Sequence, residues 1–201
     1  MSKLYFKFGA MASSKTANAL MTRFNYEEKG NHVWLIKPDL DNRDDYTDEN
    51  GVRVTVVKSR IGLSAVADVV GRDEDIHTRF VALNETQPID VIICDECQFL
   101  TAAQVDQMKY IAEYCDTPVL CFGLRSDFLT QLFEGSKRLF EIADSITEIK
   151  SVCRCGKKAI VNARIADGRV VTAGEQIEIG GNDKYEGMCW GCWQNRIKEG
   201  K

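Results

Sequence analysis

The sequence predicts an α/β fold in which a mostly parallel sheet carries helices on both faces, followed by a smaller C-terminal domain that a metal holds together. Short runs that are apolar throughout alternate with stretches of helical periodicity. A glycine-led loop joins the first run to the first helix, and two tight cysteine pairs follow a change of character near residue 150. Apolar strands that alternate with helices are typical of a parallel sheet buried on both sides.

The expected strands are short apolar runs in the first part of the chain: Leu4–Phe8, Val33–Ile36, Val91–Cys94 and Val119–Phe122. Two helices between them each show one apolar face, because apolar residues recur at intervals of three and four. These faces comprise Ala17, Leu20, Met21 and Phe24 in the first helix, and Val105, Met108, Ile111, Ala112 and Cys115 in the second. Thr101 and Gln104 match a capping box at the start of the second helix. Residues 39–50, rich in acids and amides, are expected to form a loop.

The C-terminal segment, residues 151–201, differs from the N-terminal core, residues 1–150. It contains several glycines and no long amphipathic helix, and the runs Val161–Ile165, Arg169–Thr172 and Gln176–Ile179 look like short strands. A segment of this size has little hydrophobic core of its own and needs a cross-link, such as a bound metal ion, to be stable. The cysteine pairs supply four thiolates, a ligand set typical of tetrahedral Zn²⁺. The predicted ligands of this structural site are Cys153, Cys155, Cys189 and Cys192.

The composition narrows the classes of function. Hydrophobic residues make up 44% and charged residues 28% of the 201 residues, close to globular averages, which excludes disordered and collagen-like chains. The net charge of −4 argues against a nucleic-acid partner held by phosphate neutralisation. The N-terminus lacks a secretory apolar run, and no stretch is long enough for a membrane span. We therefore expect a cytoplasmic protein with no membrane partner and with reduced thiols, in which Cys94, Cys115 and Cys121 fill the core.

A phosphate-binding loop is predicted where the first strand meets the first helix. Backbone N–H groups of such a loop and of the helix N-terminus bind phosphate oxygens, Lys15 neutralises the β- and γ-phosphates, and the Thr16 hydroxyl coordinates Mg²⁺. Ser14 stands where this motif usually has its second glycine, and a positive φ there would cost about 1–3 kcal/mol. The loop residues are Gly9, Ala10, Met11, Ala12, Ser13, Ser14, Lys15 and Thr16. The expected sheet is therefore a P-loop sheet of the RecA-like kind.

Two adjacent carboxylates, Asp95 and Glu96, follow the apolar strand Val91–Cys94. The carboxyl ends of strands in open α/β sheets face the ligand crevice. There Asp95 would hold Mg²⁺ across from Thr16, and Glu96 would serve as a base for an incoming nucleophile. The alternative is a pair of solvated acids at a strand end. Together with the loop, the pair predicts Mg-nucleotide binding.

The residues alone leave three classes of function open. The first is a small kinase. The second is a nucleic-acid-dependent P-loop ATPase, because Asp95-Glu96-Cys97-Gln98 resembles a helicase-type Walker B motif, although the short core and the acidic charge disfavour it. The third is a non-catalytic zinc module that senses a nucleotide and binds a partner or DNA.

From Tyr5 to Cys192 the chain resembles the type II thymidine kinase family, and not the herpesvirus type. The phosphate-binding loop, the two cysteine pairs and four further motifs carry the resemblance: Lys37-Pro38 with Asp41-Asn42-Arg43, Asp95-Glu96-Cys97-Gln98-Phe99, Gly123-Leu124-Arg125-Ser126-Asp127-Phe128 and Ile179-Gly180-Gly181-Asn182-Asp183-Lys184-Tyr185. The resemblance implies ATP-dependent phosphorylation of the 5′-hydroxyl of thymidine, and also of deoxyuridine, for nucleotide salvage. It implies Glu96 as the general base, Asp41 near Mg²⁺ and Arg43 facing the phosphates.

The resemblance also implies an apolar slot for the base, closed by a lasso-like loop of the zinc domain. The slot residues are Met11, Phe99, Leu124, Phe128 and Tyr185, with Asn162 facing the pyrimidine edge. The lasso contacts would come from Gln176, Ile177, Glu178, Ile179 and Gly180. Members of the family are typically homotetramers inhibited by thymidine triphosphate, and the resemblance implies both properties here.

Overall fold

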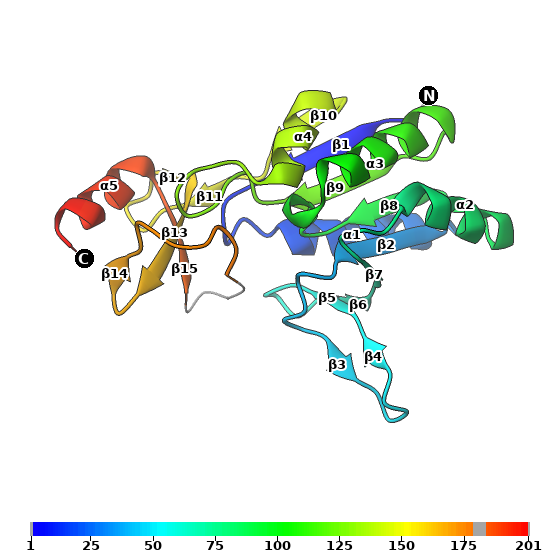
Figure 1. Ribbon diagram of the computed structural model, residues 1–201, viewed down its shortest axis with the longest axis horizontal. Helices are drawn as coiled ribbons and strands as arrows, with labels where there is room; N and C mark the ends of the chain where they lie inside the picture. Colours follow the sequence, from blue (N-terminus) through cyan, green and yellow to red (C-terminus); the bar gives the residue numbers. More distant parts are fainter. Residues whose placement is uncertain (1, 179–183, 201) are drawn as a thin grey trace.

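The computed structural model describes residues 2–178 and 184–200, and its centre is a parallel sheet (Figure 1). Within these residues the sheet has six strands in the order β10-β1-β9-β8-β2-β7, and every neighbouring pair is parallel. The strands are β1 (Leu4–Phe8), β2 (Val33–Pro38), β7 (Asp68–Val70), β8 (Val91–Cys94), β9 (Val119–Gly123) and β10 (Ser145–Glu148). The predicted α/β sheet is confirmed, and all four expected strands belong to it.

Helices cover both faces of this sheet, as predicted. Alternate residues of one strand point to opposite faces, which is clear for Ile92 and Ile93 of β8. Ile92 packs into a cluster with α2 (Ile76–Thr86), α3 (Ala102–Tyr114) and α4 (Glu134–Ile142), whereas Ile93 packs into a cluster with α1 (Lys15–Glu27). Both isoleucines are fully buried, and each contributes about 1.5–3 kcal/mol of hydrophobic stabilisation.

The predicted helical faces are confirmed for α3 and only partly for α1. The Thr101 hydroxyl accepts a hydrogen bond from the Gln104 backbone, and the Gln104 side chain accepts one from the Thr101 backbone, so the capping box is present. The buried apolar residues of α3 are Val105, Met108, Ile111 and Ala112. In α1, by contrast, Met21 and Phe24 are 47% and 61% exposed. The buried face of α1 is centred on small residues, since Ala19 packs against the sheet where the sequence pattern favoured Met21.

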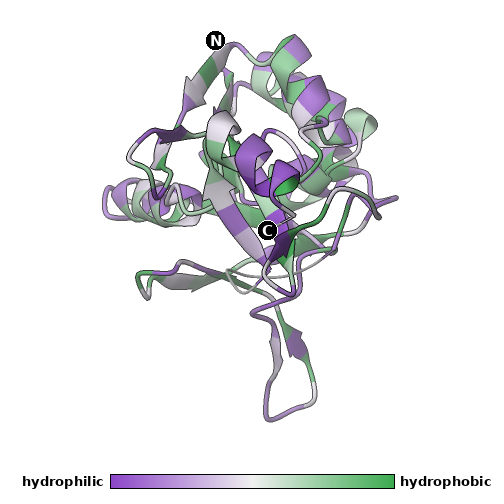
Figure 2. Cartoon of the chain, turned by 90° about the vertical axis from the view of Figure 1, so that its left-hand side faces the viewer, coloured by the Kyte–Doolittle hydropathy of each residue, from purple (hydrophilic) through white to green (hydrophobic). Residues whose placement is uncertain are grey.

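Two short hairpins follow β2. β3 (Tyr46–Thr47) pairs with β4 (Arg53–Val54), and β5 (Val56–Lys58) pairs with β6 (Ser64–Val66). The first hairpin projects from the body of the protein in Figures 1 and 2. Lys37 anchors the start of both hairpins. Its buried Nζ lies 2.9 Å from the carboxylate of Asp45, just before β3, and donates at 2.8 Å to the carbonyl of Val56, the first residue of β5. The sequence predicts only a loop over residues 39–50, since strands of two or three residues carry no periodic signal.

The C-terminal part contains short strands and a helix with an apolar cluster of their own. The elements are β11 (Ser151–Val152), β12 (Lys158–Ala159), β13 (Val161–Ala166), β14 (Arg169–Val170), β15 (Tyr185–Met188) and α5 (Trp190–Lys198). Met188 and Trp193 pack with Val161 and two of the four cysteines in this cluster. β13 confirms the predicted strand Val161–Ile165, and β14 is shorter than the predicted Arg169–Thr172. The sequence does not predict α5, which has nine residues.

The predicted strand Gln176–Ile179 is wrong over its described residues, Gln176–Glu178, which are irregular. The backbone carbonyls of Glu175 and Gln176 accept hydrogen bonds from the Arg164 guanidinium, at 3.0 and 3.4 Å, in place of a neighbouring strand. A side chain from β13 therefore satisfies this backbone. No helix in the described part of the chain is both long and apolar enough to cross a membrane.

Candidate functional site

The phosphate-binding loop has a tight and strained conformation between β1 and α1. A Cβ atom at Gly9 would lie 2.4 Å from the Ile149 carbonyl oxygen and from Ser13 Oγ, so only glycine fits there. Ala12 and Ser14 both have φ of 60°, in the left-handed region that residues with side chains rarely adopt. The positive φ considered for Ser14 is therefore present. Strain of this kind costs about 1–3 kcal/mol and clusters at ligand-binding sites.

Lys15, the first residue of α1, folds back over this loop. Its buried Nζ donates to the Ala10 carbonyl at 2.9 Å and lies 3.3 Å from Ser13 Oγ. Burial lowers the pKa of Lys15, and the charges of Glu96 and Asp95 act in the opposite direction. The loop thus holds a buried cation at a helix N-terminus, the position at which proteins commonly bind phosphate.

Asp95 follows β8 at the carboxyl edge of the sheet, where it faces the loop. Its side chain is buried and hydrogen-bonded by Thr16. Burial, followed by the neighbouring charge of Glu96, raises the pKa of Asp95 to about 7, although Thr16 and Lys15 act against the rise. A buried carboxylate with so high a pKa lacks a sufficient counter-charge. A divalent cation would supply that charge, so the residues present fit a metal ion between Thr16 and Asp95.

Both carboxylate oxygens of Glu96 accept hydrogen bonds from neighbouring side chains. Its backbone has φ of 51°, again in the left-handed region. Oε1 accepts a hydrogen bond from Arg43 Nη2 at 2.8 Å, and Oε2 accepts one from Gln98 Nε2. Arg43 also donates from Nε to Asp41 Oδ1 at 2.6 Å. Arg43 therefore bridges Asp41, which follows β2, and Glu96, which follows β8.

Gln98 orients Glu96, a role that the sequence analysis does not assign. Its side chain is 1% exposed, and its Oε1 accepts from the Leu124 backbone at 2.9 Å while its Nε2 donates to Glu96. A Cβ at Gly123 would lie 2.6 Å from Gln98 Oε1 and 2.7 Å from Cys97 Sγ. Glycine at the end of β9 therefore makes room for the side chain that positions Glu96. The only sequence signal for Gln98 is its place two residues after that acid.

A cavity of about 660 Å³ lies over the phosphate-binding loop. This volume is within the range of about 300–1,000 Å³ that is typical of small-molecule sites. Most residues predicted for phosphate and Mg²⁺ line it, whereas Gly9 and Ala10 do not. The lining residues from that prediction are Met11, Ala12, Ser13, Ser14, Lys15, Thr16, Asp41, Arg43 and Asp95, and the predicted base Glu96 lines the cavity as well. Residues 57–62 of the β5–β6 hairpin form another part of the wall, which the sequence analysis does not predict.

A second cavity shares part of its wall with the first and is much smaller, about 50 Å³. It is lined by every described residue predicted for the base slot and the lasso: Met11, Phe99, Leu124, Phe128, Asn162, Gln176, Ile177, Glu178 and Tyr185. The predicted contacts Ile179 and Gly180 lie outside the described residues. The volume of this second cavity is below the several hundred Å³ that ligand sites usually measure. Glu96 lines both cavities, so its carboxylate stands where they meet.

Asn162 links the second cavity to the phosphate-binding loop. Its Oδ1 accepts a hydrogen bond from the Met11 backbone at 2.7 Å, and its Nδ2 donates to the Ser126 carbonyl at 2.7 Å. An amide side chain has two donor hydrogens and two acceptor lone pairs. One N–H and one lone pair of Asn162 thus remain for a bound molecule.

Arg164 holds the segment of residues 171–178 against this cavity. Its guanidinium is buried 3.8 Å from the centre of the Phe128 ring and donates to the Tyr185 hydroxyl at 3.0 Å. Its Nη2 donates to the carbonyls of Glu175 and Gln176, and its Nη1 lies 3.4 Å from the Glu178 carboxylate. Arg164 is a further functional residue that the sequence analysis missed, because β-strand periodicity does not reveal what a buried arginine contacts.

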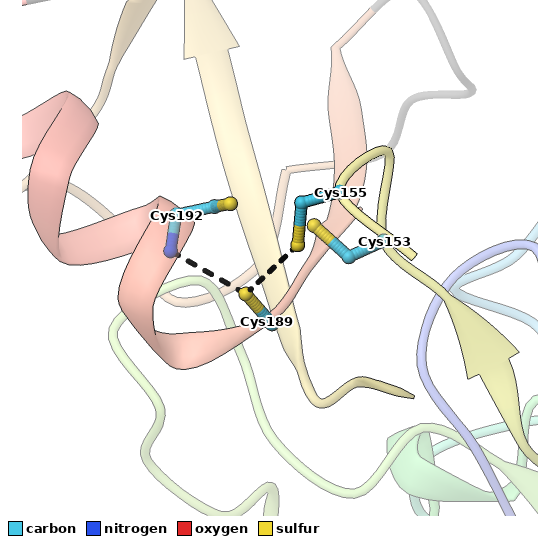
Figure 3. A group of neighbouring side chains, drawn as sticks. All are labelled: Cys153, Cys155, Cys189 and Cys192. Carbon is cyan, nitrogen blue, oxygen red and sulfur yellow. Dashed lines mark hydrogen bonds between the residues drawn. The ribbon is translucent and has the colours of Figure 1, made fainter. Parts of the chain in front are cut away.

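The four cysteines predicted as ligands point toward one another in the C-terminal part (Figure 3). Cys153 and Cys155 lie on the turn after β11, and Cys189 and Cys192 lie at the start of α5. Their sulfur atoms all lie within 4.8 Å of one another. Burial acts to raise the pKa of Cys153, but backbone N–H groups and the neighbouring thiols lower it to about 7. A cluster of four thiols with this spacing fits one tetrahedral metal ion.

The sequence of the chain matches those of known proteins. A family model described as thymidine kinase covers residues 2–193. The chain belongs to the thymidine kinase family. It is 44% identical to the thymidine kinase of Novosphingobium aromaticivorans over 190 residues, which are 94% of this chain and 95% of that protein. The thymidine kinase of Vibrio cholerae is 40% identical with the same coverage, and that of Yersinia pseudotuberculosis is 39% identical over 98% of this chain and 97% of that protein. Of the three classes of function that the residues left open, this membership assigns the kinase.

Proposed function

We propose that the protein transfers the γ-phosphoryl group of ATP to the 5′-hydroxyl of thymidine, and also of deoxyuridine. The observation that carries this proposal is the position of Glu96 between a large cavity over the phosphate-binding loop and a small, largely apolar one. A phosphate donor in the first cavity and a nucleoside in the second would meet at this carboxylate. Membership of the thymidine kinase family supports the choice of substrate.

Glu96 acts as the general base in this proposal. The contacts of Arg43 and Gln98 fix its carboxylate, which must come within hydrogen-bond reach of the 5′-hydroxyl proton. As the oxygen–phosphorus bond forms, the proton passes to Glu96, and the bond to the β-phosphate oxygen breaks to release ADP. For this step the contacts with Arg43 and Gln98 must leave one lone pair of the Glu96 carboxylate free to face the hydroxyl.

Lys15, Thr16, Asp41 and Asp95 serve the phosphates and Mg²⁺. Lys15 is already anchored over the loop, and Thr16 already bonds the buried Asp95 carboxylate. When bound, Mg²⁺ would neutralise charge on the β- and γ-phosphates. The loop N–H groups and Lys15 stabilise the negative charge on the transferring group, and preorganised donors of this kind need no reorganisation during the reaction.

The second cavity takes the thymine base between apolar side chains. Met11, Leu124 and Phe128 would pack against the ring, and the remaining amide groups of Asn162 would bond the pyrimidine edge. Residues 176–178 would cover the base. A buried polar group that meets the edge of one base rejects other bases strongly, because a mismatched edge leaves it unpaired.

The cysteine cluster holds structural Zn²⁺ in this proposal, since soft thiolate ligands select zinc. The ion would connect the turn after β11 to α5 and so stabilise the C-terminal part that carries Asn162 and Arg164. A homotetramer, inhibition by thymidine triphosphate and a cytoplasmic location stay predictions from the family resemblance.

Phosphorylation of thymidine by the purified protein with Mg-ATP tests the proposal. Glu96→Gln should keep ATP binding and lose about 100-fold or more in kcat, as expected for removal of a general base. Glu85→Gln is a matched control, since Glu85 is an exposed acid of α2 outside both cavities. Failure to convert either thymidine or deoxyuridine would overturn the proposed function. ATP hydrolysis that DNA or RNA stimulates, without nucleoside turnover, would favour the ATPase instead.

A further inference from the structure

The β5–β6 hairpin presents Arg60 to the phosphate cavity from a well-defined turn. The Ser59 backbone donates to the Leu63 carbonyl at 2.7 Å, and the Leu63 backbone donates to Ser59 Oγ at 3.0 Å. Gly62 supplies the positive φ, 90°, that closes the turn. The hairpin is also packed against the helix that follows the loop, because Val57 is buried in one cluster with Ala19 of α1. The backbone position of Arg60 relative to the phosphate-binding loop is therefore well defined.

Arg60 differs from the other arginines of this region in lacking a counter-charge. Arg43 is paired with Asp41 and Glu96, and Arg53 is paired with Asp39 and Asp45. No residue in the described part of the chain forms an ion pair or hydrogen bond with the Arg60 side chain. Partial desolvation of its guanidinium by the cavity wall and then the charge of Arg43 lower the pKa of Arg60, while Glu96 acts to raise it. A guanidinium beside other cations, without an acid of its own, is suited to bind an anionic ligand.

The charges near Arg60 indicate which part of that ligand it meets. Arg60 and Lys15 line the same cavity and repel each other, and Glu96 attracts both. Lys15 is at the phosphate-binding loop and Glu96 is the acid proposed to receive the hydroxyl proton. The group that lies between them in a kinase is the phosphoryl group in transfer. Lys58 of the same hairpin also lines the cavity, but its charge is not among those that act on Lys15 or Arg60.

We propose that Arg60 is a further catalytic residue, which contacts the γ-phosphoryl oxygens of the nucleoside triphosphate from the hairpin wall of the cavity. This inference rests on the proposed function. During transfer the bond from the 5′-oxygen to the γ-phosphorus forms, the bond to the β-phosphate oxygen breaks, and the hydroxyl proton passes to Glu96. Arg60 exchanges no proton or electrons. Its planar donors stabilise the negative charge on the equatorial oxygens of the group in transit.

Arg60→Ala and Arg60→Lys test this role, with Arg72→Ala as the control. Arg72 is an exposed arginine that lines neither cavity and lies 3.6 Å from the exposed acid Glu134. Arg60 is itself exposed on a turn, so the variants should keep the melting temperature of the wild type. Arg60→Ala should lower kcat by about 100-fold with KM for thymidine unchanged, as for loss of one transition-state donor. Arg60→Lys should recover part of the loss, because lysine keeps the charge and loses the planar fork.

A second measurement does not depend on turnover. Inorganic tripolyphosphate with Mg²⁺ should bind the wild type and the Arg72→Ala variant equally well, and Arg60→Ala about 10-fold more weakly, by calorimetric titration. Wild-type kcat and tripolyphosphate affinity in Arg60→Ala would overturn the inference. A fall in kcat matched by an equal rise in KM for thymidine would also overturn it, since a contact to the phosphate does not act on nucleoside binding. If the wild type phosphorylates no nucleoside, the proposed function fails and the tripolyphosphate titration still decides the role of Arg60.

Discussion

Replacing Arg164 with methionine is expected to weaken thymidine binding without weakening ATP binding. Arg164 is buried on β13, with its guanidinium 3.8 Å from the centre of the Phe128 ring. It donates to the Tyr185 hydroxyl and to the Glu175 carbonyl, both at 3.0 Å. The side chain therefore joins residues 171–178 to the wall of the cavity proposed for the base. Methionine keeps most of the apolar stem and removes every donor.

The magnitude follows from these contacts. A hydrogen bond from a charged donor contributes about 1.5–3 kcal/mol, and a desolvated cation–π contact contributes about 2 kcal/mol. Because neighbouring contacts are not additive, we take about 3 kcal/mol as the free energy with which Arg164 holds the segment. If residues 176–178 must be in place for thymidine to bind, this loss lowers the binding-competent fraction of the protein. KM for thymidine should then rise by up to about 100-fold, while KM for ATP changes by less than about twofold.

Initial rates with thymidine and ATP varied in turn give the two KM values. A glutamate-specific protease reports the state of the segment directly, since cleavage after Glu175 should become faster in Arg164→Met. Arg169→Met is the matched control, because Arg169 is an exposed arginine of the adjoining β14. An unchanged KM for thymidine with unchanged cleavage would refute the reasoning. A parallel rise in both KM values would show general damage to the fold and would refute it equally.

Three further predictions concern Asp95, the cluster of four cysteines and the buried thiol of Cys97. Without Mg²⁺, the pKa of Asp95 is about 7 in the fold against an ordinary 3.8, so the folded state binds more protons between these values and stability falls as pH rises through that window. Asp95→Asn should remove this loss of stability. The free energy of unfolding in urea, measured at one pH below the window and one above it, should therefore change less for the variant than for the wild type. An equal change would contradict the assignment of this pKa to Asp95. Cys189→Ser should lower both Tm and the metal content measured by elemental analysis, because a structural site needs all four ligands. Full stability of the protein without metal would show that no metal ion is needed to stabilise the C-terminal part. Cys97 should resist iodoacetamide in the native protein, since it is fully buried and burial raises the pKa of its thiol; modification detected by mass spectrometry would contradict this.

The central sheet and the phosphate-binding loop could be predicted because their signals are local. β1 and β8 have the bounds that the apolar runs gave, and the capping box of α3 needs only two residues three apart. The left-handed conformation of Ser14 follows from its position in the loop motif. The same locality led to the error over Gln176–Glu178, where alternating apolar residues look like a strand but Arg164 satisfies the backbone.

The contacts that orient the site could not be predicted, because they join residues far apart in the chain. Arg43 reaches Glu96 across 53 positions of sequence, and Gln98 reaches Leu124 across 26. The place of Arg60 depends on the fold of the 39–66 region, which Lys37 anchors through Asp45 and Val56. An arginine in a short, polar hairpin looks like an ordinary surface residue until the hairpin is placed over the loop.

The C-terminal part contacts the phosphate-binding loop directly, so the two cavities depend on one another. The Met11 backbone donates to Asn162 at 2.7 Å, and its carbonyl accepts from Ser151 Oγ at 3.2 Å. A Cβ at Gly187 would lie 3.0 Å from that carbonyl oxygen, so β15 packs closely on the loop. β13 and β15 share one apolar cluster with Cys153 and Cys189. A metal ion at the cysteines would therefore support the loop as well as the slot, and its removal should weaken ATP and thymidine binding together. Arg164→Met should weaken thymidine binding alone, and this contrast separates support of the whole C-terminal part from the hold on one segment.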